Sequence, residues 1–84
     1  MNYTVSILRR AQRELAQLPD EVYEHIRDAV RALSRDPRPP GCLKLTGREG
    51  WRIRVGKYRV IYEIDDGQQS VTVLHIGHRR DVYR

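Results

Sequence analysis

The stretch that most constrains the fold is residues 50–62, GWRIRVGKYRVIY, in which two alternating runs flank a Gly56-Lys57 link. Glycine at the first of two linking residues is typical of a type II′ turn in a β-hairpin. A two-residue turn sets the register, and it predicts that Arg54 lies directly opposite Arg59. Because side chains alternate along a strand, we expect one apolar face (Trp51, Ile53, Val55, Tyr58, Val60 and Tyr62) and one face that carries Arg52, Arg54 and Arg59.

The facing arginines favour an anion-binding site. Like charges placed directly opposite each other destabilise a sheet, so a fold that keeps such a pair often uses it to bind an anion. Arginine is well suited to phosphate because its planar guanidinium group donates two parallel hydrogen bonds. The alternative is a solvated polar face on which two arginines happen to meet. The hairpin by itself does not decide between the two interpretations.

Length and composition predict a single domain that spans residues 1–84. No apolar run approaches the length of a membrane-spanning helix, and the first residues do not have the order of a signal peptide. The one cysteine, Cys42, excludes an internal disulfide and a cysteine-based metal site. These features together predict a cytoplasmic protein.

The formal net charge of +5 is unevenly distributed along the chain. Residues 1–36 hold six basic and six acidic side chains, whereas residues 37–84 hold ten basic and five acidic ones and so carry the entire excess. A basic surface confined to one part of a protein favours polyanions such as nucleic acid, or an acidic protein partner.

The first half of the chain predicts one strand followed by two helices. Residues 2–7 alternate as a short strand, and apolar residues from Leu8 to Leu18 then recur at spacings of three or four, as in an amphipathic helix. Pro19 interrupts this helix, and Asp20 is expected to cap the second one, which runs to about Leu33. Three prolines in residues 36–41 end that helix with a stiff loop.

The second half predicts strands. Residues 42–45 form a short one, the central hairpin extends to about Ile64, and the Asp66-Gly67 pair is a strong hairpin signal before a last strand. If side chains alternate without interruption along this strand, His75 shares a face with Val60 and Tyr62. Ile76 then shares a face with the arginines, and the alternation ends at Gly77. The expected fold class is α+β, with an N-terminal strand and an αα-hairpin packed on one side of a mostly antiparallel sheet, in the order β-α-α-β-β-β-β.

Across nearly its whole length the chain resembles the RelE/ParE toxin superfamily, and more narrowly its RelE branch. The specific part consists of residues 43–47 (LKLTG), residues 50–62, and residues 73–83 (VLHIGHRRDVY). The resemblance implies a RelE-like fold and a toxin that cuts mRNA in the ribosomal A site without metal or other cofactor. In this family the ribose 2′-OH attacks the adjacent phosphate, which leaves a cyclic phosphate and a 5′-hydroxyl.

The resemblance also implies a set of site residues. The catalytic positions correspond to Arg52, Arg54, Arg59, Arg79 and Tyr83, and we expect RNA contacts from Lys44, Arg48, Lys57, His78 and Arg80. Some relatives have lysine at the first two positions, but arginine does not give up its proton. We therefore expect these two arginines to position phosphate and stabilise charge. Tyr83, a ribosomal group or no discrete group would act as base, and His78 either contacts the RNA backbone or replaces Arg79 as the proton donor.

Three functions remain open at this stage. The first is a ribosome-dependent mRNA endonuclease, and the absence of a carboxylate cluster on the arginine face disfavours a metal nuclease. The second is a ParE-like inhibitor of DNA gyrase on the same scaffold, and the third is a nucleic-acid-binding module without catalysis. The expected partners are a RelB-like antitoxin, the ribosome with its mRNA, and operator DNA through the toxin-antitoxin complex. The antitoxin would lie across the basic face or displace residues 77–84.

Overall fold

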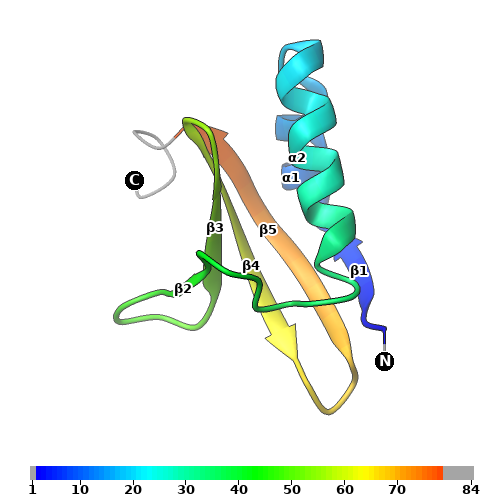
Figure 1. Cartoon of the computed structure of the whole chain (residues 1–84), viewed down its shortest axis with the longest axis vertical. Coiled ribbons are helices and arrows are strands. Elements are labelled where there is room, and N and C mark those ends of the chain that lie inside the picture. The colour runs from blue at the N-terminus through cyan, green and yellow to red at the C-terminus, as the bar shows by residue number, and fades with distance from the viewer. Residues whose placement is uncertain (1, 79–84) are drawn as a thin grey trace.

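The computed structural model describes residues 2–78, as one sheet with two helices on one of its faces (Figure 1). The sheet order is β1-β5-β4-β3-β2; β1 runs parallel to β5, and all other neighbours are antiparallel. This arrangement confirms the expected α+β fold and its element order. The elements are β1 (Thr4–Ile7), α1 (Arg9–Ala16), α2 (Asp20–Ala32), β2 (Leu43–Lys44), β3 (Trp51–Val55), β4 (Tyr58–Asp65) and β5 (Ser70–His78).

The hairpin of β3 and β4 has the predicted register. Arg54 pairs with Arg59 and Val55 with Tyr58, which leaves two residues in the turn. Gly56 has a φ of 59°, whereas Lys57 is not among the residues with positive φ. Positive φ at the first linking residue alone is the type II′ pattern, so the sequence identified both the turn and the register that it sets.

The core lies between the helices and the apolar face of the sheet. Amphipathic spacing directs Ala11 and Leu15 of α1 and Ile26 and Val30 of α2 toward the strands. The Tyr62 side chain is fully buried, and its hydroxyl donates to the Pro37 carbonyl at 2.7 Å, while burial raises its pKa. The proline-rich loop is thereby fixed to the core. The strands contribute mainly Ile53, Val60, Tyr62, Val71, Val73 and Ile76.

The start of α2 differs in detail from the prediction. Pro19, not Asp20, occupies the N-cap position, and it makes no side-chain capping bond. Asp20 and Glu21 instead stand in the first turn, where their negative charges interact favourably with the positive end of the helix dipole. Among the described residues, no helix is long and apolar enough to cross a membrane.

The last strand corrects the predicted alternation. Tyr62 pairs with Val73, but Ile61 pairs with His75, so Leu74 is an extra residue in a β-bulge. The bulge reverses the parity of the later residues in the strand, and Ile76 therefore lies beside Val60 in the core, at 1% exposure. The grouping of His75 with Val60, and of Ile76 with the arginines, was wrong. The strand also continues through Gly77 to His78 rather than ending at Gly77.

A polar cluster fixes the other end of the sheet. The Asp66 carboxylate accepts hydrogen bonds from the Tyr3 hydroxyl at 2.7 Å and from both terminal nitrogens of Arg38 at 2.9 and 3.3 Å. The bonds from Arg38 and Tyr3 lower the pKa of Asp66. The Arg38 guanidinium also lies 5.0 Å from the centre of the Trp51 ring. The cluster thus ties β1, the proline-rich loop and β3 to the turn after β4.

Candidate functional site

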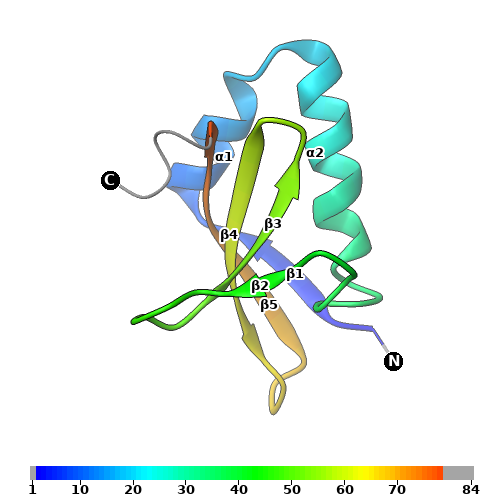
Figure 2. The same cartoon turned by 60° about the vertical axis from the view of Figure 1, so that its left-hand side comes forward.

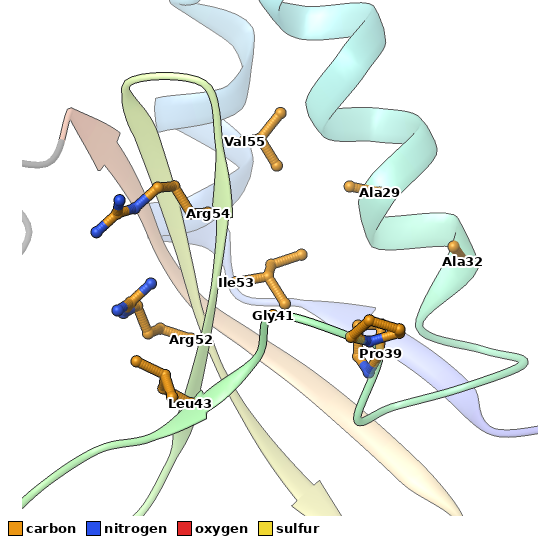
Figure 3. Close-up of a pocket in the computed structure, with 10 residues that line it drawn as sticks. Ala29, Ala32, Pro39, Gly41, Leu43, Arg52, Ile53, Arg54 and Val55 are labelled. Carbon is orange, nitrogen blue, oxygen red and sulfur yellow. The ribbon is translucent and has the colours of Figure 1, made fainter.

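The candidate site is the sheet face that the helices leave open. In Figure 3, Arg52 and Arg54 leave β3 on the side away from α2, whereas Ile53 and Val55 point toward that helix. This is the separation that strand alternation predicts for GWRIRV. We refer to the side of the sheet that carries Arg52, Arg54 and Arg59 as the arginine face.

Three neighbouring positions form one row across the arginine face. Arg54 pairs with Arg59, and Arg59 pairs on its other side with Gly77. Arg54 is exposed, whereas Arg59 is half-buried with its Nε atom shielded from solvent. Gly77 places no side chain beside Arg59. The row therefore brings two positive charges together next to a residue without a side chain, near the end of β5.

A second row surrounds Arg52 with apolar side chains. Arg52 pairs with Leu43 on one side and Ile61 on the other, and Ile61 pairs in turn with His75. Leu43 is 53% exposed although it is a large apolar residue, while Ile61 is only 2% exposed. Charged groups interact more strongly where apolar neighbours reduce the local dielectric constant. Arg52 is thus suited to hold an anion, with Leu43 as an apolar contact beside it.

Two hollows border these arginines. A cleft of about 620 Å³ runs between α2, the proline-rich loop and β3. Figure 3 shows Ile53 and Val55 on the side of β3 that faces Ala29 and Ala32, whereas the side chains of Arg52 and Arg54, which also line the cleft, point away from α2. A hollow of about 380 Å³ is lined by residues 43–46 together with Arg48 and Arg52. The exposed loop residue Arg48, predicted to contact RNA, therefore shares a hollow with Arg52.

Lys44, His78 and Lys57 have different surroundings. Lys44 lines the same hollow as Arg48, but it pairs with Trp51, and its amine lies 5.6 Å from the centre of the indole ring. The register thus assigns it to the Trp51 side of the sheet. His78 ends β5 opposite Tyr58, with the two ring centroids 5.6 Å apart at an interplanar angle of 75°. Lys57 is exposed in the turn beside them.

The opposite end of the sheet is acidic. A hollow of about 410 Å³ is lined by Glu49, Glu63, Asp65 and Asp66 with their neighbours. Glu63 belongs to the arginine face by alternation from Arg59 and Ile61. Phosphate groups are repelled there and attracted at the β3–β4 turn. The positive charge of the arginine face is therefore concentrated at the end where Arg54 and Arg59 lie, whereas His78, which pairs with Tyr58, lies on the other side of the sheet.

The remaining predicted site residues, Arg79, Arg80 and Tyr83, lie outside the described residues. Within residues 2–78 the structure brings Arg52, Arg54 and Arg59 onto one face as expected from the register. The catalytic and RNA-binding roles of all these residues stay predictions. Over the same range, no group of three or more His, Cys, Asp or Glu side chains is arranged to hold a metal ion.

Sequence reasoning missed a contact between Glu14 and His75 at the edge of β5. The His75 Nδ1 atom lies 2.6 Å from Glu14 Oε2 of α1, and Glu14 Oε1 accepts the Ile76 N–H at 3.0 Å. Both ring nitrogens of His75 are shielded from solvent, so the ring does not present a nitrogen to a substrate. The pair depends on the bulge, which has no marker in the sequence. It could not have been found from spacing.

Several known toxins resemble this chain in sequence and in structure. The family described as the ParE toxin of the type II toxin-antitoxin system parDE matches residues 5–83. Toxin RelG from Mycobacterium tuberculosis is 38% identical over 86 residues, which cover 100% of this chain and 99% of that protein. Toxin RelE from the same organism is 36% identical over 84 residues, covering 98% of this chain and 87% of that protein.

Solved structures agree with these sequence relatives. The chain superposes on the RelBE2 toxin-antitoxin complex from Mycobacterium tuberculosis with a TM-score of 0.83 and 30% identity, over 94% of this chain and 100% of that one. It superposes on the archaeal RelE-RelB complex from Pyrococcus horikoshii with a TM-score of 0.84 and 27% identity, over 98% and 100%. The chain belongs to the RelE/ParE superfamily of type II toxin-antitoxin toxins, and within it to the RelE branch.

Proposed function

We propose that this chain is a ribosome-dependent endonuclease that cuts mRNA in the A site and thereby stops translation. The observation that carries the proposal is the row of Arg54 and Arg59 on an open face, with Arg52 two residues away along the same strand. A structural sheet face has no need for two facing arginines, because their repulsion destabilises it. A phosphate between them converts the repulsion into attraction.

The chemistry requires no metal. The ribose 2′-oxygen attacks the adjacent phosphorus, the bond from phosphorus to the 5′-oxygen breaks, and the products are a cyclic phosphate and a 5′-hydroxyl. The proton of the 2′-OH passes to a base, and the departing 5′-oxygen takes up a proton. Between these events the phosphorane carries two negative charges, which guanidinium groups stabilise by charge and by paired hydrogen bonds.

Arg52, Arg54 and Arg59 supply charge in this scheme rather than move protons. Arginine does not release its proton near neutral pH, so the base and the acid must be sought elsewhere. Tyr83 would act as the base or orient the 2′-OH against a stacked nucleobase. Arg79 would stabilise the charge on the leaving oxygen, and His78 is the candidate that donates the proton. Lys44, Arg48, Lys57, His78 and Arg80 would contact the RNA backbone.

The same scheme implies the partners of the protein. The structures of related toxins that resemble this chain include complexes with RelB antitoxins, which supports a RelB-like antitoxin as the inhibitor of this protein. The toxin-antitoxin complex would bind its own operator DNA. Free toxin would act in the cytoplasm, on mRNA held by the ribosome.

Primer extension on a reporter mRNA tests the proposal directly. One reaction contains a translating extract with the purified protein, and a parallel reaction contains the same mRNA and protein without ribosomes. Cuts only in the translating reaction, at a fixed place within codons, are expected. Cuts in both reactions would indicate a free ribonuclease, and cuts in neither would contradict the proposal.

Arginine variants connect the activity to the face. Replacing Arg59 and Arg79 together with alanine should abolish cleavage and growth arrest while leaving the fold intact. Arg31 on α2 is exposed and distant in sequence from the face, so Arg31→Ala provides a control for the loss of a surface arginine. A folded double variant that still arrested growth fully would contradict the assigned site.

Inhibition of DNA gyrase is the second candidate, because the family match carries the ParE description. A gyrase inhibitor would arrest growth without cutting mRNA. The two functions therefore separate in one experiment, in which cells expressing the protein are examined for mRNA cuts and for loss of negative supercoiling in a plasmid. Supercoiling loss with intact mRNA would favour the ParE-like function.

A further inference from the structure

Strand β5 continues beyond its pairing with β1, so one edge of its last residues needs another partner. Strand β1 pairs with β5 only as far as Val73, and the Leu8 N–H to Val73 carbonyl bond, at 3.0 Å, is the last on that side. From Leu74 onward β5 has a strand neighbour only in β4, within the part of the chain that the structure describes. An uncovered edge leaves backbone groups that need other partners.

Glu14 supplies that partner from α1, which lies beside the end of β5 (Figure 2). One carboxylate oxygen accepts the Ile76 N–H at 3.0 Å, and the other lies 2.6 Å from His75 Nδ1. The side chains of Glu14 and His75 are only 24% and 14% exposed. A hydrogen bond from a backbone N–H to a partly buried carboxylate is stronger than one between neutral groups.

The contact falls immediately after the bulge at Leu74. Bulges redirect a strand and re-aim its later side chains. Here the later residues are Ile76 in the core, Gly77 beside Arg59, and His78 against the Tyr58 ring. Glu14 therefore holds the last part of β5 at the edge opposite its ladder with β4.

We infer that Glu14 is a positioning residue, which clamps the bulged end of β5 and so fixes Gly77 and His78 beside Arg59 and Tyr58. The importance of this for activity rests on the proposed function. The His75 ring lies against the second carboxylate oxygen. Neither residue acts on the substrate, because the His75 nitrogens are shielded and Glu14 is occupied by β5. Misplacement of a catalytic group by about 1 Å can reduce a rate about a hundredfold.

Two substitutions at Glu14 separate positioning from general support of the fold. Glu14→Met keeps a long, helix-forming side chain but removes the acceptor, whereas Glu14→Gln keeps an oxygen that can accept the Ile76 N–H. Glu24 on α2 is exposed, and Glu24→Met is the matched control. If Glu14→Met does not fold, Glu14→Ser replaces it, since serine is too short to reach β5.

Amide hydrogen exchange measured by NMR tests the contact between Glu14 and β5 directly, without any assay of activity. In Glu14→Met we expect the Ile76 amide to exchange at least tenfold faster than in wild type, and the ring contact of His78 with Tyr58 to weaken. Glu14→Gln and Glu24→Met should stay within about threefold of wild type. Unchanged exchange at Ile76 in Glu14→Met, or equal acceleration in Glu14→Gln, would overturn the inference.

Cleavage in the translating extract provides the second readout. We expect Glu14→Met to cut mRNA at least tenfold more slowly than wild type at saturating ribosome concentration, with Glu14→Gln retaining most of the rate. Full cleavage by Glu14→Met despite faster exchange would overturn the positioning role. If wild type itself did not cut mRNA, the proposed nuclease would fail, and the exchange rates would still decide whether Glu14 clamps β5.

Discussion

Replacing Arg54 with glutamine should stabilise the protein and at the same time remove most of its activity. Arg54 is exposed and pairs directly with Arg59. Two unit charges about 7 Å apart in water repel each other by about 0.6 kcal/mol, and the substitution removes that repulsion. For a domain of this size the melting temperature should rise by roughly 2–5 °C. Cleavage should fall by about a hundredfold, as when one donor to a transition-state oxyanion is lost.

The assay is thermal denaturation of the purified variant at low and high salt, beside cleavage in the translating extract. Screening at about 1 M salt shortens the Debye length to about 3 Å, so the gain in stability should disappear there. Arg54→Lys keeps the charge and should show no gain, and Arg48→Gln removes a loop arginine outside the row. A lower melting temperature for Arg54→Gln, or a gain that high salt left unchanged, would refute the electrostatic reasoning.

Two further predictions concern the supports of the sheet. Tyr62→Phe leaves the buried Pro37 carbonyl without its donor and should lower the free energy of unfolding by about 1–3 kcal/mol, measured by urea denaturation; a change below about 0.3 kcal/mol would contradict this. Asp66→Asn should lower the melting temperature at neutral pH. The bonds from Arg38 and Tyr3 lower the pKa of Asp66, so its stabilisation is complete above the unfolded pKa of about 3.9 and is lost as pH falls through the lower folded pKa. The melting curves of Asp66→Asn and wild type should therefore converge in acid, and a gap that persisted would contradict the assignment.

The hairpin could be predicted from the sequence because turn chemistry and side-chain alternation agree there. A two-residue link with glycine first admits few conformations, and the apolar alternation of Ile53, Val55 and Val60 fixes which face meets the helices. The pairing of Arg54 with Arg59 depends on those two facts alone. The same reasoning assigned most core contacts of both helices, because their apolar spacing has one period. Leu8 is the exception, since it precedes α1 and is 47% exposed.

The errors arose where tertiary contacts outweigh local pattern. The bulge at Leu74 has no sequence marker, since leucine suits either side of a strand, and glycine at position 77 resembles a strand end although β4 pairs with it. The charge of Lys44 suggests a place with the arginines, but its pairing with Trp51 depends on the path of the proline-rich loop. The Glu14 contact required both the bulge and the position of α1, neither of which spacing reveals.

Removing the bulge at Leu74 tests whether this feature of β5 serves the site or the fold. Deleting Leu74 leaves every other pair of the β4–β5 ladder in register and keeps Ile76 beside Val60. We therefore expect the deletion variant to fold with a change in unfolding free energy within about 1 kcal/mol, as for a substitution outside the core, while its cleavage rate falls at least tenfold.

Deleting Ile61 from β4 instead provides the control. Ile61 pairs with Arg52 and with His75, and its loss would turn Val60 out of the core and place Arg59 there. That variant should not fold. A Leu74 deletion that unfolded as readily would show that the bulge is needed for the core, and one that cut mRNA at the wild-type rate would show that its geometry does not serve the arginine face. Only a Leu74 deletion variant that folds but cleaves mRNA slowly would agree with the view that the geometry at the end of β5 serves the arginine face.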